Sequence, residues 1–126
     1  MSKTFAAMAA VSFMLASSAA FAQAAKVADT PKGKAYVDAK GMTLYTFDKD
    51  AGGKSACNGP CATNWPPLMA AADAKASGDW TIVTRDDGSK MWALKGKPLY
   101  TFAKDTKPGD TTGDGFLNGA WHIAKP

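Results

Sequence analysis

A ribbon of eleven residues occurs twice in this chain, 55 positions apart. Residues 40–50 read KGMTLYTFDKD and residues 95–105 read KGKPLYTFAKD, so eight of the eleven aligned positions are identical. A match of this quality at a fixed offset indicates an internal duplication. One copy of about 45 residues could hardly fold alone, because short chains bury too small a fraction of their surface. The duplication therefore predicts two half-sized units that complete one hydrophobic core.

The repeated residues have the alternation expected of strands. Successive side chains of a strand point to opposite faces, so Tyr45 and Phe47 share one face. Tyr100 and Phe102 share the equivalent face in the second copy. Two aromatic strands with the same phase can bury their rings together about a pseudo-two-fold axis. We therefore expect these four rings to form one shared core.

Other segments also favour strands and tight turns. Runs rich in β-branched and aromatic residues alternate with short clusters such as DDGS and KGK. An alanine-rich stretch that ends at Gly78 has the propensity of a short helix. The predicted fold class is mainly β, with antiparallel hairpins from a duplicated motif packed as one small pseudo-two-fold domain. The expected elements are a hairpin over 34–47, a helix over 69–78, strands over 80–84, 91–94 and 99–102, and a closing strand over 120–124.

The first 22 residues have the three parts of a secretory signal peptide. A positive charge at Lys3 precedes an apolar stretch over 6–16, and the sequence AFA at 20–22 supplies the small-x-small cleavage pattern. The apolar stretch is too short for a membrane span. We therefore expect cleavage after Ala22 and a periplasmic or secreted protein without a transmembrane anchor.

Removal of this segment would leave one small domain. Residues 23–33 are small and polar, and we expect a flexible leader there. Residues 34–126 should form a single domain, with the two copies at about 34–68 and 89–126. Without Lys3, 14 Lys and Arg oppose 11 Asp for a net charge of +3, and the lysines are spread along the chain. This mild charge does not predict nucleic-acid binding, and we expect a monomer.

The two cysteines, Cys57 and Cys61, lie in the sequence CNGPC. In an exported protein, an even pair across turn-forming residues predicts a disulfide first. A redox dithiol is the first alternative, although such pairs usually have two intervening residues at a helix start. Metal ligation is the second alternative, although His122 is the only histidine and a four-ligand set is lacking.

Asp50 and Asp105 each follow the repeated Phe by three residues, where the strand should end. One interpretation is a turn-forming Asp that accepts backbone amides. A second pairs each Asp with the Tyr hydroxyl of its own copy, Tyr45 or Tyr100, at the rim of a ligand cleft. A third adds later aspartates of the sequence DTKPGDTTGDG as calcium ligands around Asp105. The spacing differs from the known calcium loop and no Glu follows, so we expect no metal and no cofactor.

Residue sets for catalysis are sparse. His122 is flanked by Trp121 and Ile123 in an expected strand, and a structural role is favoured over a general base. Neither Ser-x-x-Lys nor Gly-x-Ser-x-Gly occurs. No catalytic residue is assigned, and the sequence favours a protein that is not an enzyme.

The duplicated pattern resembles a known bacterial family. Tyr-x-Phe-x-x-Asp occurs as Tyr45/Phe47/Asp50 and as Tyr100/Phe102/Asp105. The pattern is similar to that of the "secreted repeat of unknown function" family of predicted lipoproteins and exported proteins. The segment CNGPCATNWPPL at 57–68 and the ending over 102–126 resemble that family too. This chain lacks the lipidation Cys of many members, which favours a soluble periplasmic protein over an anchored one.

Three function classes follow from the sequence. The leading one is a non-catalytic accessory module that binds a small molecule or an envelope component through its aromatic-rich surface. Four tryptophans support it, although we expect at least two of them in the core: Trp65, Trp80, Trp92 and Trp121. The alternative is a redox or electron-transfer accessory that uses Cys57 and Cys61. The third class is a hydrolase of unknown substrate.

Overall fold

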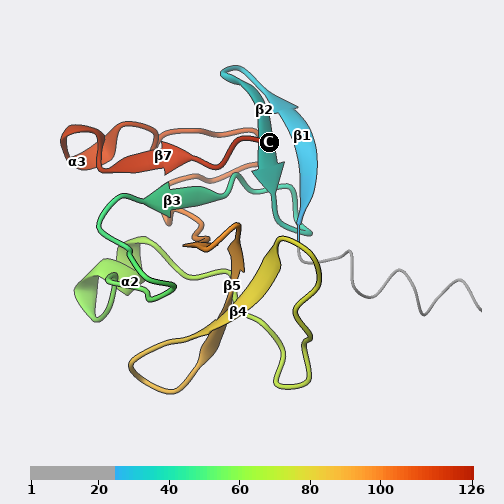
Figure 1. Cartoon of the computed structure of the whole chain (residues 1–126). Helices are drawn as coiled ribbons and strands as arrows, with labels where there is room; N and C mark the ends of the chain where they lie inside the picture. Colours follow the sequence, from blue (N-terminus) through green and yellow to red (C-terminus); the bar gives the residue numbers. More distant parts are fainter. Residues whose placement is uncertain (1–24) are drawn as a thin grey trace, which may run out of the picture.

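The computed structural model describes residues 25–126, which contain both copies of the ribbon (Figure 1). The predicted signal peptide and the first two residues of the predicted leader lie outside the described residues. Within 25–126, no helix has the length and apolarity needed to cross a membrane.

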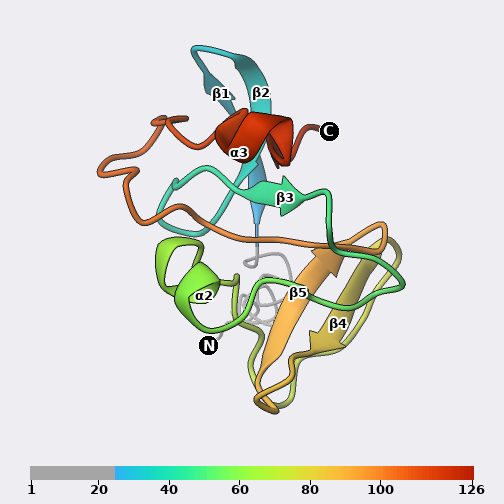
Figure 2. The same cartoon turned by 90° about the vertical axis from the view of Figure 1, so that its left-hand side faces the viewer.

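The described chain folds into three small antiparallel sheets, which confirms the mainly β fold class (Figures 1 and 2). In both views the β1–β2 hairpin and the β4–β5 hairpin lie toward opposite ends of the domain, with β3 between them. Figure 1 shows β7 beside β3. The strands are β1 (Lys26–Thr30), β2 (Gly33–Val37), β3 (Tyr45–Phe47), β4 (Trp80–Thr84), β5 (Lys90–Leu94), β6 (Lys97–Pro98) and β7 (Trp121–Ile123). The short helices are α2 (Pro60–Asn64) and α3 (Phe116–Gly119).

A pseudo-two-fold relation is visible in the backbone hydrogen bonds at the centre of the domain. The Tyr45 N–H donates to the Tyr100 carbonyl at 2.7 Å, and the Tyr100 N–H donates to the Tyr45 carbonyl at 3.0 Å. The two copies of the ribbon therefore run antiparallel and meet at their tyrosines. This is the packing that the duplication predicted.

Matching backbone bonds extend the relation beyond the ribbon. The Tyr36 N–H donates to the Ala124 carbonyl at 2.8 Å, and the Trp92 N–H donates to the Leu68 carbonyl at 2.9 Å. Tyr36 thus corresponds to Trp92, and Leu68 corresponds to Ala124, with an offset of 56 rather than 55. The β2–β3 connection is one residue longer than its counterpart between β5 and the second ribbon.

The alternating residues of the ribbon fill two cores on opposite faces. All four aromatic residues of the ribbon lie in one buried cluster, as the phase of the strands predicted: Tyr45, Phe47, Tyr100 and Phe102. Leu44 and Leu99 point the other way and pack with Leu94 and Ala124 in a second buried cluster. Both copies contribute residues to both clusters, so neither half is complete alone.

The flexible leader expected over 23–33 is wrong for the residues from Lys26 onward. They form β1, its turn and the start of β2, in register from Lys26 opposite Val37 to Thr30 opposite Gly33. Most side chains of β1 face solvent, which explains the polar composition. The backbone pairing holds the strand in place without a buried apolar face.

The helix expected over 69–78 is also wrong. Met69 is bridged to Met91, Ser77 is bridged to Trp80, and the residues between them form turns and extended chain. A short alanine-rich segment gains little from helix propensity alone, so pairing with the neighbouring strands decides its conformation. Helix α2 begins at Pro60, a residue type common at the first helical position.

The strand expected over 99–102 is replaced by isolated bridges. The strand β6 covers Lys97–Pro98, and Tyr100 is bridged to both Tyr45 and Pro67. The second copy of the ribbon lies between the first copy and the segment around Pro67, so its backbone hydrogen bonds are divided between these two partners.

Candidate functional site

The repeated tyrosines and aspartates bond across the two copies. The Tyr45 hydroxyl donates to Asp105 Oδ2 at 2.6 Å, and the Tyr100 hydroxyl donates to Asp50 Oδ2 at 2.6 Å. The hypothesis that each Asp pairs with the Tyr of its own copy is therefore wrong. Both tyrosines are 0 % exposed, so their hydroxyls lie inside the domain rather than at a rim.

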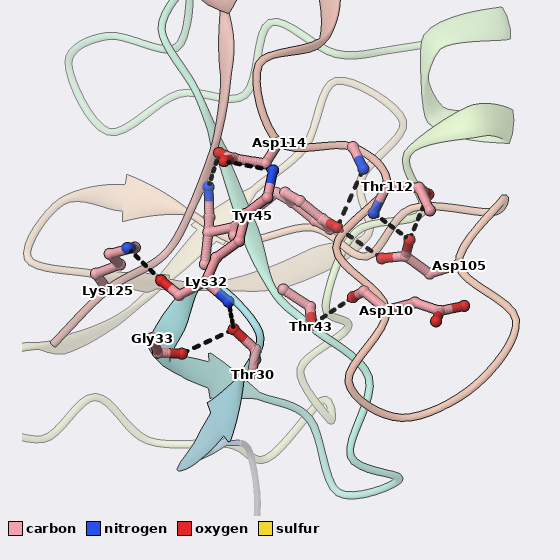
Figure 3. Close-up of polar contacts among 12 residues, drawn as sticks. Thr30, Lys32, Gly33, Thr43, Tyr45, Asp105, Asp110, Thr112, Asp114 and Lys125 are labelled. Carbon is pink, nitrogen blue, oxygen red and sulfur yellow. Dashed lines mark hydrogen bonds and ion pairs between the residues drawn. The ribbon is translucent and has the colours of Figure 1, made fainter.

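Asp105 is enclosed by the chain that follows it (Figure 3). Its Oδ1 accepts hydrogen bonds from the Thr112 N–H at 2.9 Å and from the Thr112 hydroxyl at 2.5 Å. The Gly113 N–H donates to the Tyr45 oxygen at 3.3 Å. A Cβ on Gly113 would lie 2.6 Å from the Trp65 ring, so only glycine fits here. The carboxylate thus ties the C-terminal loop to the core.

Asp50 has an equivalent but extended network. Its Oδ1 accepts from the Ala56 N–H at 2.6 Å, while Tyr100 lies 2.6 Å from the Ser55 hydroxyl. The guanidinium of Arg85 donates to Ser55 Oγ at 3.0 Å. Since Tyr100 gives its proton to Asp50, Ser55 donates to Tyr100. A chain of hydrogen bonds therefore joins a cation to a carboxylate through two hydroxyls.

Arg85 is a structural residue that the sequence reasoning missed. It is 6 % exposed, and its Nη2 donates to the Cys57 carbonyl at 2.9 Å and to Asn58 Oδ1 at 3.3 Å. The sequence contained a signal for this role, because Arg85 is the only arginine in a chain rich in lysine. The planar fork of arginine suits such a multi-acceptor position better than lysine does.

Burial controls the protonation of these groups. It raises the pKa of Tyr45 and of Tyr100 well above the usual range, and the hydrogen bonds to Asp105 and Asp50 add to this effect. Burial also raises the pKa of the Asp50 carboxyl, against the lowering effect of the Tyr100 hydrogen bond. Both phenols therefore remain protonated at neutral pH and act as donors, which does not suit them to act as nucleophiles or bases.

Stacked rings cross the pseudo-two-fold axis. The Trp65 and Trp121 rings are parallel, with centroids 3.7 Å apart. Phe47 stacks on the outer face of Trp121 at 4.2 Å, and Phe102 stacks on Trp65 at 4.0 Å. Each Trp therefore packs on the Phe of the other copy. The expectation that at least two tryptophans belong to the core is confirmed for this pair.

The other two tryptophans are partly buried and pack edge-on against each other. The ring centroids of Trp80 and Trp92 are 6.1 Å apart. Tyr36 packs edge-on against Trp80 from the other side at 6.0 Å. Among the described residues, most aromatic side chains therefore take part in packing contacts with other rings.

Cys57 and Cys61 form a disulfide, as the pattern CNGPC predicted. Cys57 is fully buried in the main core, while Cys61 packs against it from helix α2. The bond links the loop after the first ribbon to the start of α2. Arg85 holds the same loop from the other side through the Cys57 carbonyl.

The aspartates proposed for a cation have separate partners. Asp110 Oδ2 accepts from the Thr106 N–H at 2.9 Å, a bond that holds the pKa of Asp110 below its usual range. Asp114 forms an ion pair with Lys32 at 3.3 Å (Figure 3). Across residues 25–126, no group of three or more His, Cys, Asp or Glu side chains is placed to hold a metal ion.

A groove of about 370 Å³ opens on the outer face of the β3–β7 sheet, beside the turn between β5 and β6. None of the repeated Tyr, Phe or Asp residues of the two motifs lines it. Its rim is charged, and its floor consists of residues of the second core and their backbone. The lining residues are Thr46, Asp48, Leu94, Lys95, Lys97, Leu99, His122, Ile123, Ala124 and Lys125.

His122 and Asp48 form a pair on one side of this groove. Thr46 lies opposite His122 in the β3–β7 register, and the His122 Nε2 is 2.9 Å from Asp48 Oδ2. Since an ionised carboxylate only accepts, Nε2 is the donor in this bond. The histidine ring is 50 % exposed, so it belongs to the surface and not to the core.

Comparison with known protein families gives one match, which covers both halves of the domain. The model described as "secreted repeat of unknown function" matches residues 26–69 and 81–125. The first match includes β1, consistent with the strand found in place of the expected leader. Comparisons with curated proteins and with solved structures give no match.

Proposed function

From the premise that this chain belongs to the family of secreted repeats of unknown function, we propose that it is an exported accessory module. It binds a component of the cell envelope and does not catalyse a reaction. The protein acts in the periplasm or outside the cell after cleavage behind Ala22. The intact mass of the exported protein tests the location, because it should begin within two residues of Gln23 and carry no lipid adduct.

The main support is that the repeated motif is occupied by internal contacts. Each Tyr hydroxyl is bonded to an Asp of the other copy, and both carboxylates also accept backbone amides. Because the polar side-chain atoms of the motif are bonded within the domain, the motif has a structural role. Few of its hydrogen-bonding groups remain free to contact a substrate. Recognition then falls to the surface, and the groove beside β7 is a concave part of that surface.

The redox alternative finds less support. Cys57 is fully buried and Cys61 is partly buried against the main core. A dithiol that exchanges electrons needs an exposed sulfur of lowered pKa. We therefore assign Cys57 and Cys61 a structural role in the loop that follows the first ribbon.

Nuclear magnetic resonance of the mature protein tests binding directly. Isotope-labelled protein is mixed in turn with purified peptidoglycan, with lipopolysaccharide and with an extract of periplasmic small molecules. We expect at least one fraction to shift amide signals of the β3–β7 surface, while the side-chain ring signals of the buried Tyr45 and Tyr100 stay in place. If no fraction shifts any signal, or if the protein alters the fraction chemically, the proposal is wrong.

A further inference from the structure

The groove on the β3–β7 sheet has a net positive rim. Three ammonium groups, from Lys95, Lys97 and Lys125, face one carboxylate, from Asp48, so the charged lining sums to +2. All three lysines are exposed. The Lys125 ammonium donates one hydrogen bond to the Lys32 carbonyl at 2.8 Å, which leaves two of its three N–H groups for a ligand.

The turn that carries two of these lysines has an unusual residue choice. Lys95 and Gly96 both have positive φ, 53° and 83°, in the tight turn between β5 and β6. Such turns prefer Asn, Asp or Gly at the first position, because a larger side chain is strained there. Lysine at this position therefore has a cost in stability, and Lys95 lines the groove.

The duplication supplies an internal comparison for the rim. The ribbon and its paired tryptophans carry the same core residues in both copies, and Lys95 also has an equivalent lysine, Lys40, whereas three other positions on the groove differ. Where the groove has Lys97, His122 and Lys125, the equivalent positions of the other half have Met42, Pro66 and Met69. The same scaffold thus forms without Lys97 and Lys125. The presence of these two lysines on one half only is a property of the groove and not a requirement of the fold.

These observations lead to a ligand class, and the inference rests on the proposed binding function. We propose that the groove binds the phosphate group of a small phosphorylated molecule of about the size of a sugar phosphate. A phosphate dianion balances the +2 charge of the lining. Lysine ammonium groups are common phosphate ligands, and they bind as point charges without a fixed fork. The volume of about 370 Å³ lies at the low end for small-molecule sites, which suits a ligand of this size.

Titration of the mature protein with glucose 1-phosphate, inorganic phosphate and glucose tests this assignment. We expect glucose 1-phosphate and phosphate to shift the amide signals of 94–97 and 122–125, and glucose to shift none. The variant Lys95→Gln/Lys97→Gln should weaken glucose 1-phosphate binding by about tenfold, because two charged contacts are lost.

The matched control is Lys40→Gln/Lys104→Gln, which removes the same charge from exposed positions outside the groove. Lys40 is the equivalent of Lys95 in the other half. The affinity of this control variant for glucose 1-phosphate should stay within about twofold of that of the parent protein. Equal weakening in both variants would overturn the assignment, because diffuse charge would then explain binding. So would the absence of shifts with both phosphate compounds.

The two sets of binding experiments distinguish the phosphate assignment from the proposed binding to an envelope component. If an envelope fraction binds the β3–β7 surface and the Lys95/Lys97 variant binds it equally well, the module function stands and the phosphate assignment fails. If the phosphate compounds bind the groove but no envelope fraction does, the assignment stands and the envelope function fails. If nothing binds, both are wrong.

Discussion

The Tyr45 hydroxyl donates a 2.6 Å hydrogen bond to the Asp105 carboxylate, although the two residues belong to different copies of the duplicated ribbon. Tyr100 and Asp50 repeat the arrangement in the opposite sense. The two halves are thus joined by reciprocal polar bonds as well as by a shared core.

The first prediction concerns the Tyr45–Asp105 bond. Tyr45→Phe keeps the ring but leaves a buried carboxylate with one partner fewer, so it should destabilise the domain by about 1–3 kcal/mol. Tyr36→Phe is the control, because the Tyr36 side chain is half-buried and packs through its ring. Urea unfolding of both variants measures the difference. A Tyr45→Phe variant that unfolds like the parent would show that the bond contributes little.

The second prediction concerns the stacked aromatic rings, which are Phe47, Trp121, Trp65 and Phe102. Phe47→Ala and Phe102→Ala should each destabilise the whole domain by ~3–5 kcal/mol, because each removes one end of a close-packed stack. Phe116→Ala should cost only ~1 kcal/mol, since Phe116 is 43 % exposed. Thermal melting monitored by Trp fluorescence compares the three. Parent-like melting of both core variants would contradict the shared core.

The third prediction concerns pH. Burial raises the pKa of Asp50 above 3.8, so the folded state holds this proton more tightly than the unfolded state does. The contribution of Asp50 to stability is therefore most favourable below pH 3.8 and is lost as the pH rises through the folded-state pKa. Asp50→Asn lacks this titration, so its stability relative to the parent should increase with pH over the acid range.

Urea unfolding of the parent and of Asp50→Asn at several acidic and neutral pH values checks this sign. The comparison within one pair cancels the titration of the other carboxylates. A relative stability that decreases as the pH rises would mean that the hydrogen bonds from Tyr100 and Ala56 outweigh the cost of burying the charge.

The fourth prediction concerns the disulfide. Cys57 and Cys61 of the exported protein should resist alkylation until the protein is reduced and unfolded. Replacement of both by alanine should cost about 2 kcal/mol, because the closed loop is short. Mass spectrometry after thiol labelling checks the first part and urea unfolding the second. Free labelling of the native protein would contradict the structural role of the bond.

Local sequence patterns determined much of the architecture. The duplication, the period-two alternation of Tyr45 with Phe47 and the pair in CNGPC predicted two equivalent halves, a shared aromatic core and a disulfide. The alternation and the cysteine pair depend on near neighbours in the chain and can be read from a short window, and the duplication can be read by comparing two stretches of sequence. Segments with weak local preference, such as the alanine-rich stretch over 69–78, were predicted wrongly because their partners are distant.

Only the tertiary structure decided which residues meet. The phase of a strand shows that Tyr45 and Tyr100 point inward, but not that each reaches the Asp of the other copy. The antiparallel contact of the two ribbons determines this pairing of each Tyr with the Asp of the other copy, since it places each tyrosine near the end of the other ribbon. The groove likewise combines residues of β3, β7 and the β5–β6 turn, and Lys95 and Lys125 line one groove only when those segments pack. Long-range packing, with no signal in any one stretch of sequence, determines both.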